Sequence, residues 1–147
     1  PAEDDLRAAF LQFQQQGVTE LIIDFRYNGG GLVRIAELMG DLIAANQVGQ
    51  IFSRTTLRAS KAAENEIDRF GTQAQAISAT KIAFIGTGST ASASELVANA
   101  MIPYLGNNLA LVGSNTFGKP VGQFAFDRAE CDDRLRVVTF RTENASG

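Results

Sequence analysis

The sequence has no histidine, no tryptophan and only one cysteine among its 147 residues. Without histidine, the chain cannot itself form a Ser-His-Asp or Cys-His catalytic site, or a zinc site with histidine ligands. Cys131, standing alone, can form neither an internal disulfide nor a CxxC site. Any nucleophile in this chain therefore needs a base other than imidazole.

Positive charge is also scarce, with 13 Lys and Arg against 16 Asp and Glu and a net charge of −3. This balance gives no basic footprint for nucleic acid or for an anionic membrane surface. No apolar run approaches the roughly 18 residues that a membrane span needs. The length and the 45% hydrophobic content predict one globular domain over residues 1–147. Because the chain opens at Pro1 without a signal pattern, we expect it to be a fragment or a processed product.

Strands and helices alternate along the sequence, which predicts an α/β fold with at least some parallel pairing. Apolar stripes at helical spacing predict helices, and short β-branched runs predict strands. Residues 60–78 are polar, and we expect a loop with some helix there. The expected helices are 3–16, 32–45 and 92–105, with a kink or early end at Pro103, and the expected strands are 18–25, 50–59, 81–85, 109–112, 121–126 and 135–141.

The first candidate for chemistry is the small-residue stretch Thr90-Ala91-Ser92-Ala93-Ser94-Glu95. It follows a predicted strand and begins a predicted helix, so a hydroxyl there lies near the positive end of the helix dipole. The alternative is a plain N-terminal cap, because Ser92 and Glu95 fit the capping-box spacing.

The second candidate is Lys119, which stands between Gly118 and Pro120 with Gln123 close behind. Its flanks suggest a fixed turn that aims the side chain, and burial beside apolar groups favours the neutral amine that a general base requires. The alternative is a solvated lysine on a turn. In a chain without histidine, serine plus lysine is the simplest pair that can activate a hydroxyl.

The third candidate is the turn Asn28-Gly29-Gly30-Gly31. The amides of Gly29 or Gly30 could bind an oxyanion, since no side chain blocks approach. The alternative is a strand-to-helix turn whose glycines only supply positive φ angles.

A competing motif lies at Gly113 to Lys119, which matches the first seven positions of the phosphate-binding pattern GxxxxGK[ST]. The eighth position is Pro120, which has no hydroxyl for a metal ion. The residues that follow alternate as a strand, whereas a P-loop opens a helix. The sequence therefore disfavours nucleotide binding.

Together, the segments LIIDFRYNGGG (21–31), GSTASASELVANAM (88–101) and ALVGSNTFGKPVGQ (110–123) resemble peptidase family S41, the carboxyl-terminal processing or tail-specific proteases. The resemblance implies a ClpP/crotonase-like core of ββα units, with a mixed sheet flanked by helices. It implies a serine–lysine dyad with Ser92 as nucleophile and Lys119 as base, and a polypeptide substrate. Gln123 would orient the lysine, and the oxyanion hole would use the amides of Ala93 and of Gly29 or Gly30. No metal or organic cofactor is implied.

Some features of that family are not matched. Pro120 replaces the usual glycine after the lysine, and no PDZ domain is present, so we expect a catalytic core only. Such a core would expose apolar patches or sheet edges, associate with itself and be weakly active or inactive alone. The family's usual export implies a periplasmic or extracytoplasmic location. The alternative function is a non-catalytic module that binds peptides or apolar ligands on the same fold.

Overall fold

The computed structural model describes residues 2–147, and its strands form two sheets. The strands are β1 (Glu20–Asp24), β2 (Ile51–Leu57), β3 (Glu66–Arg69), β4 (Lys81–Gly86), β5 (Leu109–Gly113), β6 (Val121–Arg128) and β7 (Asp133–Glu143). The first sheet is parallel, in the order β1-β4-β5, and the second is antiparallel, in the order β3-β2-β7-β6.

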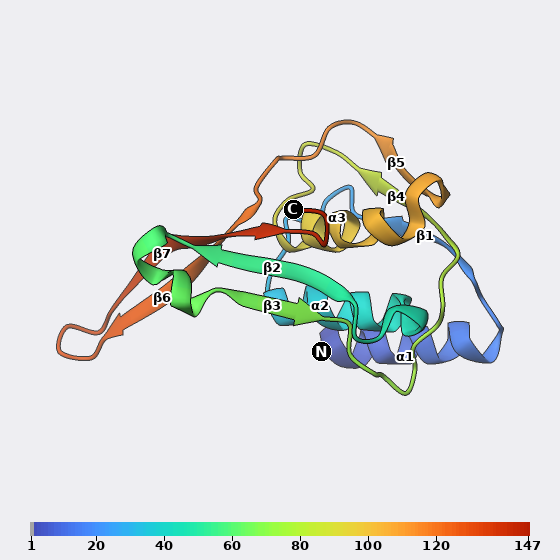
Figure 1. Ribbon diagram of the computed structural model, residues 1–147, viewed down its shortest axis with the longest axis horizontal. Coiled ribbons are helices and arrows are strands. Elements are labelled where there is room, and N and C mark those ends of the chain that lie inside the picture. The colour runs from blue at the N-terminus through green and yellow to red at the C-terminus, as the bar shows by residue number, and fades with distance from the viewer. Residues whose placement is uncertain (1) are drawn as a thin grey trace.

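The helices are α1 (Ala2–Gln15), α2 (Val33–Ile43) and α3 (Ala93–Leu105), with short 3₁₀ turns at Ala45–Gln47, Ala59–Glu64 and Gly106–Asn108. Helix α3 contacts strands of both sheets, α2 packs on α3, and α1 packs on α2 (Figure 1). The predicted α/β class is confirmed, with the strands divided between a parallel and an antiparallel sheet.

The predicted elements agree with the structure to within two residues at each end, with one strand missed. Residues 60–78 contain β3, which pairs antiparallel with β2. Its sequence, Glu-Ile-Asp-Arg, has a single apolar residue, and Ile67 is half exposed. Backbone pairing with β2, and not burial of an apolar face, therefore defines this strand, so periodicity could not reveal it.

The sequence suggested a kink or an early end of α3 at Pro103, and the helix instead continues past Pro103 to Leu105. A proline at this position leaves the carbonyl of Asn99 without its helical N–H partner. The side-chain amide of Asn144, which is buried near the end of the chain, donates to that carbonyl over 3.2 Å. The distant amide thus replaces the missing hydrogen bond, and the helix runs on.

The core lies around α2 and α3, between the helices and the two sheets. The predicted apolar stripe of α1 faces it, with Phe10 buried and Leu6 and Phe13 packed against the core. Phe25 and Phe84 stack with their ring centroids 5.6 Å apart. Phe25 directly follows β1, and Phe84 lies near the carboxyl end of β4.

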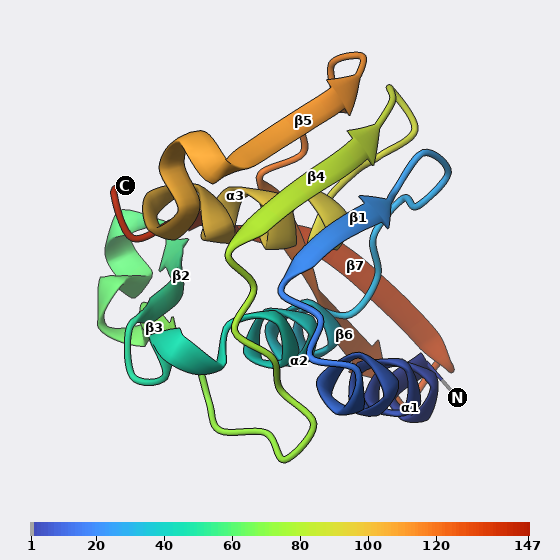
Figure 2. The same ribbon diagram turned by 90° about the vertical axis from the view of Figure 1, so that its right-hand side faces the viewer.

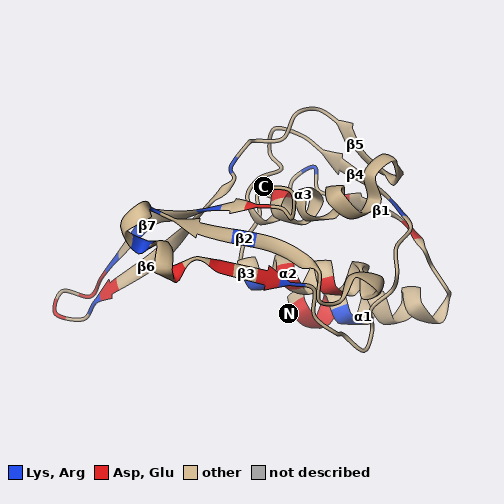
Figure 3. Cartoon of the chain, in the orientation of Figure 1, with Lys and Arg blue, Asp and Glu red and all other residues tan. Residues whose placement is uncertain are grey.

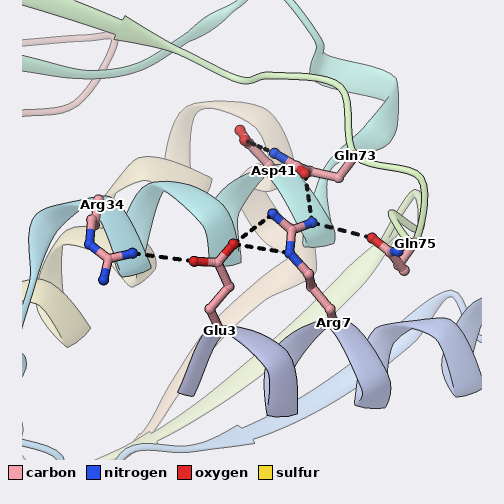
Figure 4. Close-up of polar contacts among 6 residues, drawn as sticks. All are labelled: Glu3, Arg7, Arg34, Asp41, Gln73 and Gln75. Carbon is pink, nitrogen blue, oxygen red and sulfur yellow. Dashed lines mark hydrogen bonds and ion pairs between the residues drawn. The ribbon is translucent and has the colours of Figure 1, made fainter. Parts of the chain in front are cut away.

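A polar network joins α1 to α2 and to the loop before β4 (Figure 4). The Arg7 guanidinium donates to Glu3 within α1 over 3.0 Å and to Gln73 in the loop over 2.8 Å. Arg34 of α2 donates to the other oxygen of Glu3 over 3.3 Å, which links the two helices. The hydrogen bond from Arg7 is the main reason why the pKa of Glu3 is lowered. The six side chains drawn are Glu3, Arg7, Arg34, Asp41, Gln73 and Gln75.

Acidic side chains gather on α2 and β3 (Figure 3). Burial of the Glu37 carboxyl raises its pKa, and the nearby carboxylates of Asp68, Asp41 and Glu66 raise it further.

Strands β6 and β7 form a hairpin that projects from the rest of the molecule (Figure 1). The cross-strand pairs Phe124–Val137 and Phe126–Leu135 lie two residues apart, so they share one face. All four side chains are exposed, and they form the type of apolar surface that the sequence led us to expect. No helix within residues 2–147 is long and apolar enough to cross a membrane.

The parallel sheet brings all three candidate segments to one edge. Asp24 pairs with Ile85, and Gly86 pairs with Gly113, so the carboxyl ends of β1, β4 and β5 are level. Figure 2 shows the three strands side by side, with their connecting loops at the same end. Those loops contain the glycine turn, Ser92 and Lys119, at the edge where sites form in α/β sheets.

Packing of α2 on β2 generates a test of the core. A Cβ atom on Gly40 would lie 2.4 Å from the ring of Phe52, which is fully buried. We expect Gly40→Ala to lower the free energy of unfolding by about 1–3 kcal/mol, because overpacking outweighs the gain in helix propensity. Gly88→Ala is the control, since a Cβ there meets no atom within 4 Å. Urea titration measures both, and an unchanged Gly40→Ala variant would contradict this view of the core.

Candidate active site

Ser92 occupies a strained backbone position immediately before α3. Its φ of 57° and ψ of −118° fall in a region that residues with a side chain rarely adopt. Within residues 2–147, Asp132 in the β6–β7 turn is the other non-glycine residue with positive φ. Strain of this kind persists where neighbouring contacts enforce it, and it often marks a functional site.

Those contacts come from the loop after β1. The carbonyl of Asn28 accepts from the amide of Ala91 over 3.2 Å. The buried hydroxyl of Thr90 donates to the carbonyl of Phe25, and Thr87 donates to that of Arg26, each over 2.6 Å. Three hydrogen bonds therefore hold the glycine-turn loop against the loop that carries Ser92.

Gly30 makes the closest approach between the two loops. A Cβ atom built on it would lie 2.7 Å from the Ala91 carbonyl oxygen, 2.7 Å from the Ala93 amide nitrogen and 2.9 Å from the Ser92 Cβ. With a φ of +92° as well, this position admits only glycine. The amide of Gly30 donates to the side-chain oxygen of Asn28 over 3.0 Å.

The carboxylate of Glu95 joins the Ser92 loop to the Lys119 loop. One oxygen accepts from the amides of Ser92 (2.7 Å) and Lys119 (2.9 Å). The other accepts from the hydroxyl of Thr116 (2.7 Å) and the amide of Gly118 (2.6 Å). Four donors therefore converge on one carboxylate, which fixes the backbone of both candidate residues.

The protonation of Glu95 follows from these contacts. Burial by itself raises the pKa of this carboxyl, but the hydrogen bonds from Thr116, Lys119, Gly118 and Ser92 together outweigh burial and lower the pKa below its usual 4.5. The group is therefore ionised at neutral pH, and it accepts all four hydrogen bonds in that form.

Ser92 and Lys119 line the same cavity, which has a volume of about 460 Å³. Its walls come from β4, β5, α3 and the loop between β5 and β6. Most of the lining is apolar, and the largest such side chains are Phe25, Phe84, Ile85, Leu96, Ile102, Leu109 and Leu111. We call this space the first cavity.

A second cavity of about 300 Å³ is lined by the glycine turn and by the start of α3, including Asn28, Gly30, Gly31 and Ala93. Phe25 lines both cavities. Ser92 lines the first cavity and the neighbouring Ala93 lines the second, so the serine stands where the two spaces approach each other.

The remaining predicted residues lie differently. Gln123 is exposed on β6, opposite Val138, and it is not among the residues that line the first cavity. Gly29 precedes Gly30 on the exposed glycine turn. The segment 113–119 is followed by the strand β6, as the sequence suggested, and not by the helix that a P-loop opens.

Sequence reasoning missed what Glu95 does beyond capping. The capping-box spacing correctly predicted its contact with the Ser92 amide, and that contact is present. The spacing gave no sign of the contacts to Thr116, Gly118 and Lys119, which lie more than 20 residues away. Within residues 2–147, no group of three or more His, Cys, Asp or Glu side chains could hold a metal ion.

The convergence of four donors on Glu95 generates a test of stability. We expect Glu95→Gln to lower the free energy of unfolding at pH 7 by about 1–3 kcal/mol, because an amide NH₂ group cannot accept from the donors that it would face. The folded-state pKa is lowered, so the carboxylate's contribution is complete above pH 4.5 and is lost as the pH falls through the lowered value.

The difference between the two proteins should therefore shrink in acid, which denaturant titration at pH 7 and pH 3 measures. Glu64→Gln is the control, because Glu64 makes an exposed ion pair with Lys61 and should change stability little. An equal loss at both pH values would contradict the role of the ionised carboxylate.

The sequence matches the family model described as peptidase family S41 over residues 1–147. It is 34% identical to the chloroplastic C-terminal processing peptidase of Tetradesmus obliquus over 149 residues, which is 95% of this chain and 28% of the algal protein. It is 28% identical over 120 residues to a Staphylococcus epidermidis protein named "Probable CtpA-like serine protease", covering 81% of this chain and 23% of that one.

Solved structures show the same fold. A Bacteroides fragilis crystal structure that carries an S41 protease assignment superposes with a TM-score of 0.87 at 28% identity, over 97% of this chain and 38% of that one. The photosystem II D1 C-terminal processing protease superposes with a TM-score of 0.74 at 24% identity, over 99% of this chain and 35% of that one. The chain thus spans between 23% and 38% of the length of these relatives. By the family match over its whole length, the chain belongs to peptidase family S41.

Proposed function

We propose that this chain is the hydrolytic core of a serine peptidase, with Ser92 as nucleophile and Lys119 as general base. The observation that carries the proposal is that both residues line one cavity, while Glu95 binds the backbone amides of both. The strained backbone of Ser92 at the start of α3 supports the assignment, because such turns expose a nucleophile to substrate.

In the proposed reaction, the neutral amine of Lys119 takes the proton of the Ser92 hydroxyl as Oγ attacks a peptide carbonyl. The resulting ammonium returns that proton to the leaving amine when the carbon–nitrogen bond breaks, which leaves an acyl-enzyme ester on Ser92. Water then attacks the ester with Lys119 again as base, releasing the acid and restoring the serine.

The tetrahedral oxyanion would be stabilised by the amide of Ala93, at the positive end of α3, and by an amide of the glycine turn. Gly29 and Gly30 were the candidates from the sequence. Gly30 approaches Ala93 closely, but its amide already donates to Asn28, so an oxyanion would have to share that donor. Gln123 would orient Lys119 only if its side chain turned from β6 toward the lysine amine.

The substrate would be a polypeptide that binds across the two cavities. We also propose an extracytoplasmic location, because the chain resembles the exported proteases of family S41. In support, one similar protein is chloroplastic, and one solved structure of the same fold, at 16% identity, is a lipoprotein of Streptococcus agalactiae.

The dyad predicts a pattern among single variants. We expect Ser92→Ala and Lys119→Ala each to remove nearly all peptide hydrolysis and the double variant to lose little more, because the two residues act as one unit. Ser94→Ala should be mild, since Ser94 is buried in α3 and is assigned no chemical step. Hydrolysis of a quenched fluorescent peptide measures all four.

Labelling with a fluorophosphonate separates this proposal from a binding module on the same fold. The proposal requires the label on Ser92 and none on the Ser92→Ala variant. Inactivation by Ser94→Ala with Ser92→Ala still active would mean that the nucleophile is wrongly assigned. Peptide binding without any label would favour the binding module.

The first cavity predicts a preference for apolar side chains next to the scissile bond. The Glu95 oxygens already accept four hydrogen bonds, so they have few acceptor positions left for a polar side chain, and the rest of the wall is largely apolar. We expect peptides with Leu or Phe there to show a kcat/KM about 10- to 100-fold above that of glycine peptides.

Ala98→Leu, which adds bulk to the wall of the first cavity, should reduce that preference. Ala110→Leu is the control, because Ala110 is exposed on β5 and does not line this cavity. A preference left intact by Ala98→Leu would place the side-chain site elsewhere.

A further inference from the structure

Asn28 makes three hydrogen bonds that link the end of β1, the glycine turn and the Ser92 loop. Its amide donates to the carbonyl of Phe25 over 3.0 Å, and its carbonyl accepts from the amide of Ala91 over 3.2 Å. Its side-chain oxygen accepts from the amide of Gly30 over 3.0 Å. One residue therefore binds both the residue before the nucleophile and the glycine that lies against it.

The side-chain bond matters because of where Gly30 lies. Hypothetical Cβ contacts of 2.7 Å to the Ala93 nitrogen and 2.9 Å to the Ser92 Cβ show that the Gly30 backbone packs directly on the start of α3. A shift of this turn by even 1 Å would change the distance between the turn amides and the amide of Ala93. An oxyanion site of two amides tolerates little such change.

The hydrogen bond from the Gly30 amide to the Asn28 side chain also restricts the glycine turn, whose three glycines have no side chains. Three consecutive glycines have the largest conformational freedom of any tripeptide, and Asn28 and Gly29 are exposed. An asparagine oxygen that accepts from the amide two residues later closes a compact turn. Asn28 thus removes freedom from the glycine turn at the position next to Ser92.

We infer that Asn28 is a positioning residue for oxyanion stabilisation: its side chain holds the glycine turn in register with the amide of Ala93. This inference rests on the proposed peptidase function. It assigns Asn28 no proton transfer and no direct contact with the reacting atoms; it acts through Gly30.

The test compares Asn28→Ala, Asn28→Ser and the control Asn107→Ala, whose asparagine is exposed in the turn before β5. We expect Asn28→Ala to reduce kcat by about 100-fold with KM changed by less than about threefold, because binding in the ground state does not use the oxyanion site. Asn28→Ser should fall between this variant and the unmodified protein, since a hydroxyl accepts the same bond more weakly.

A second readout separates positioning from a general structural role. Affinity for a peptide boronate, which forms the tetrahedral adduct, should fall in parallel with kcat, whereas affinity for an unreactive product peptide should not change. Unchanged kcat in Asn28→Ala, or a loss confined to KM, would overturn the inference. If Asn28→Ala does not fold, the same comparison on Asn28→Ser decides.

The inference can fail separately from the proposed function. If neither this chain nor a longer form with its flanking segments hydrolyses a peptide, the proposed function has failed, and backbone amide NMR shifts still test the coupling. Asn28→Ala should then shift the amide resonances of Ser92 and Ala93, and Asn107→Ala should not. Shifts confined to residues 29–31 would show that Asn28 orders only its own turn, and the inference would be wrong.

Discussion

The carboxylate of Glu95 is the constraint on which the site geometry depends. The donors that it binds come from two loops that follow different strands, and no other described carboxylate receives so many main-chain amides. A single ionised group inside this junction is costly to desolvate, and the converging donors repay that cost only when both loops are in place. Folding of the Lys119 loop and the backbone conformation of Ser92 are therefore energetically coupled.

The rest of the fold provides the frame for that junction. The parallel sheet sets the carboxyl ends of β1, β4 and β5 level with one another, and the rings of Phe25 and Phe84 stack on each other near that edge. Helix α3 packs between the two sheets and presents its N-terminus at the same edge. The antiparallel sheet adds a contact to the Lys119 loop, because the amide of Thr142 donates to the carbonyl of Pro120 over 2.9 Å.

The spacing of apolar residues along the sequence was sufficient to predict most of the helices and strands, and the exceptions have physical reasons. Helices and strands with an apolar face can be predicted from the spacing of their apolar residues. Strand β3 has no such face, because it is defined by backbone pairing with β2. The continuation of α3 past Pro103 depends on Asn144, which lies 41 residues later in the sequence. The candidate residues Ser92, Lys119 and the glycine turn were identified from motifs, and the sheet explains why they share one edge. The contacts of Glu95 with Thr116 and Gly118, and the use of the Gly30 amide by Asn28, depend on loop geometry that no period encodes.

The separation of the site segments along the chain has a consequence for the order of folding. Asn28, Ser92 and Lys119 are separated by 64 and 27 residues, and each belongs to a loop that follows a different strand of the parallel sheet. Closing such long loops is entropically unfavourable until the sheet contacts form, so the junction assembles among the last steps. A partly folded chain would carry the nucleophile without the geometry that activates it. The proposed hydrolytic centre would therefore have no activity during synthesis, when the unfolded chain itself would be the nearest substrate.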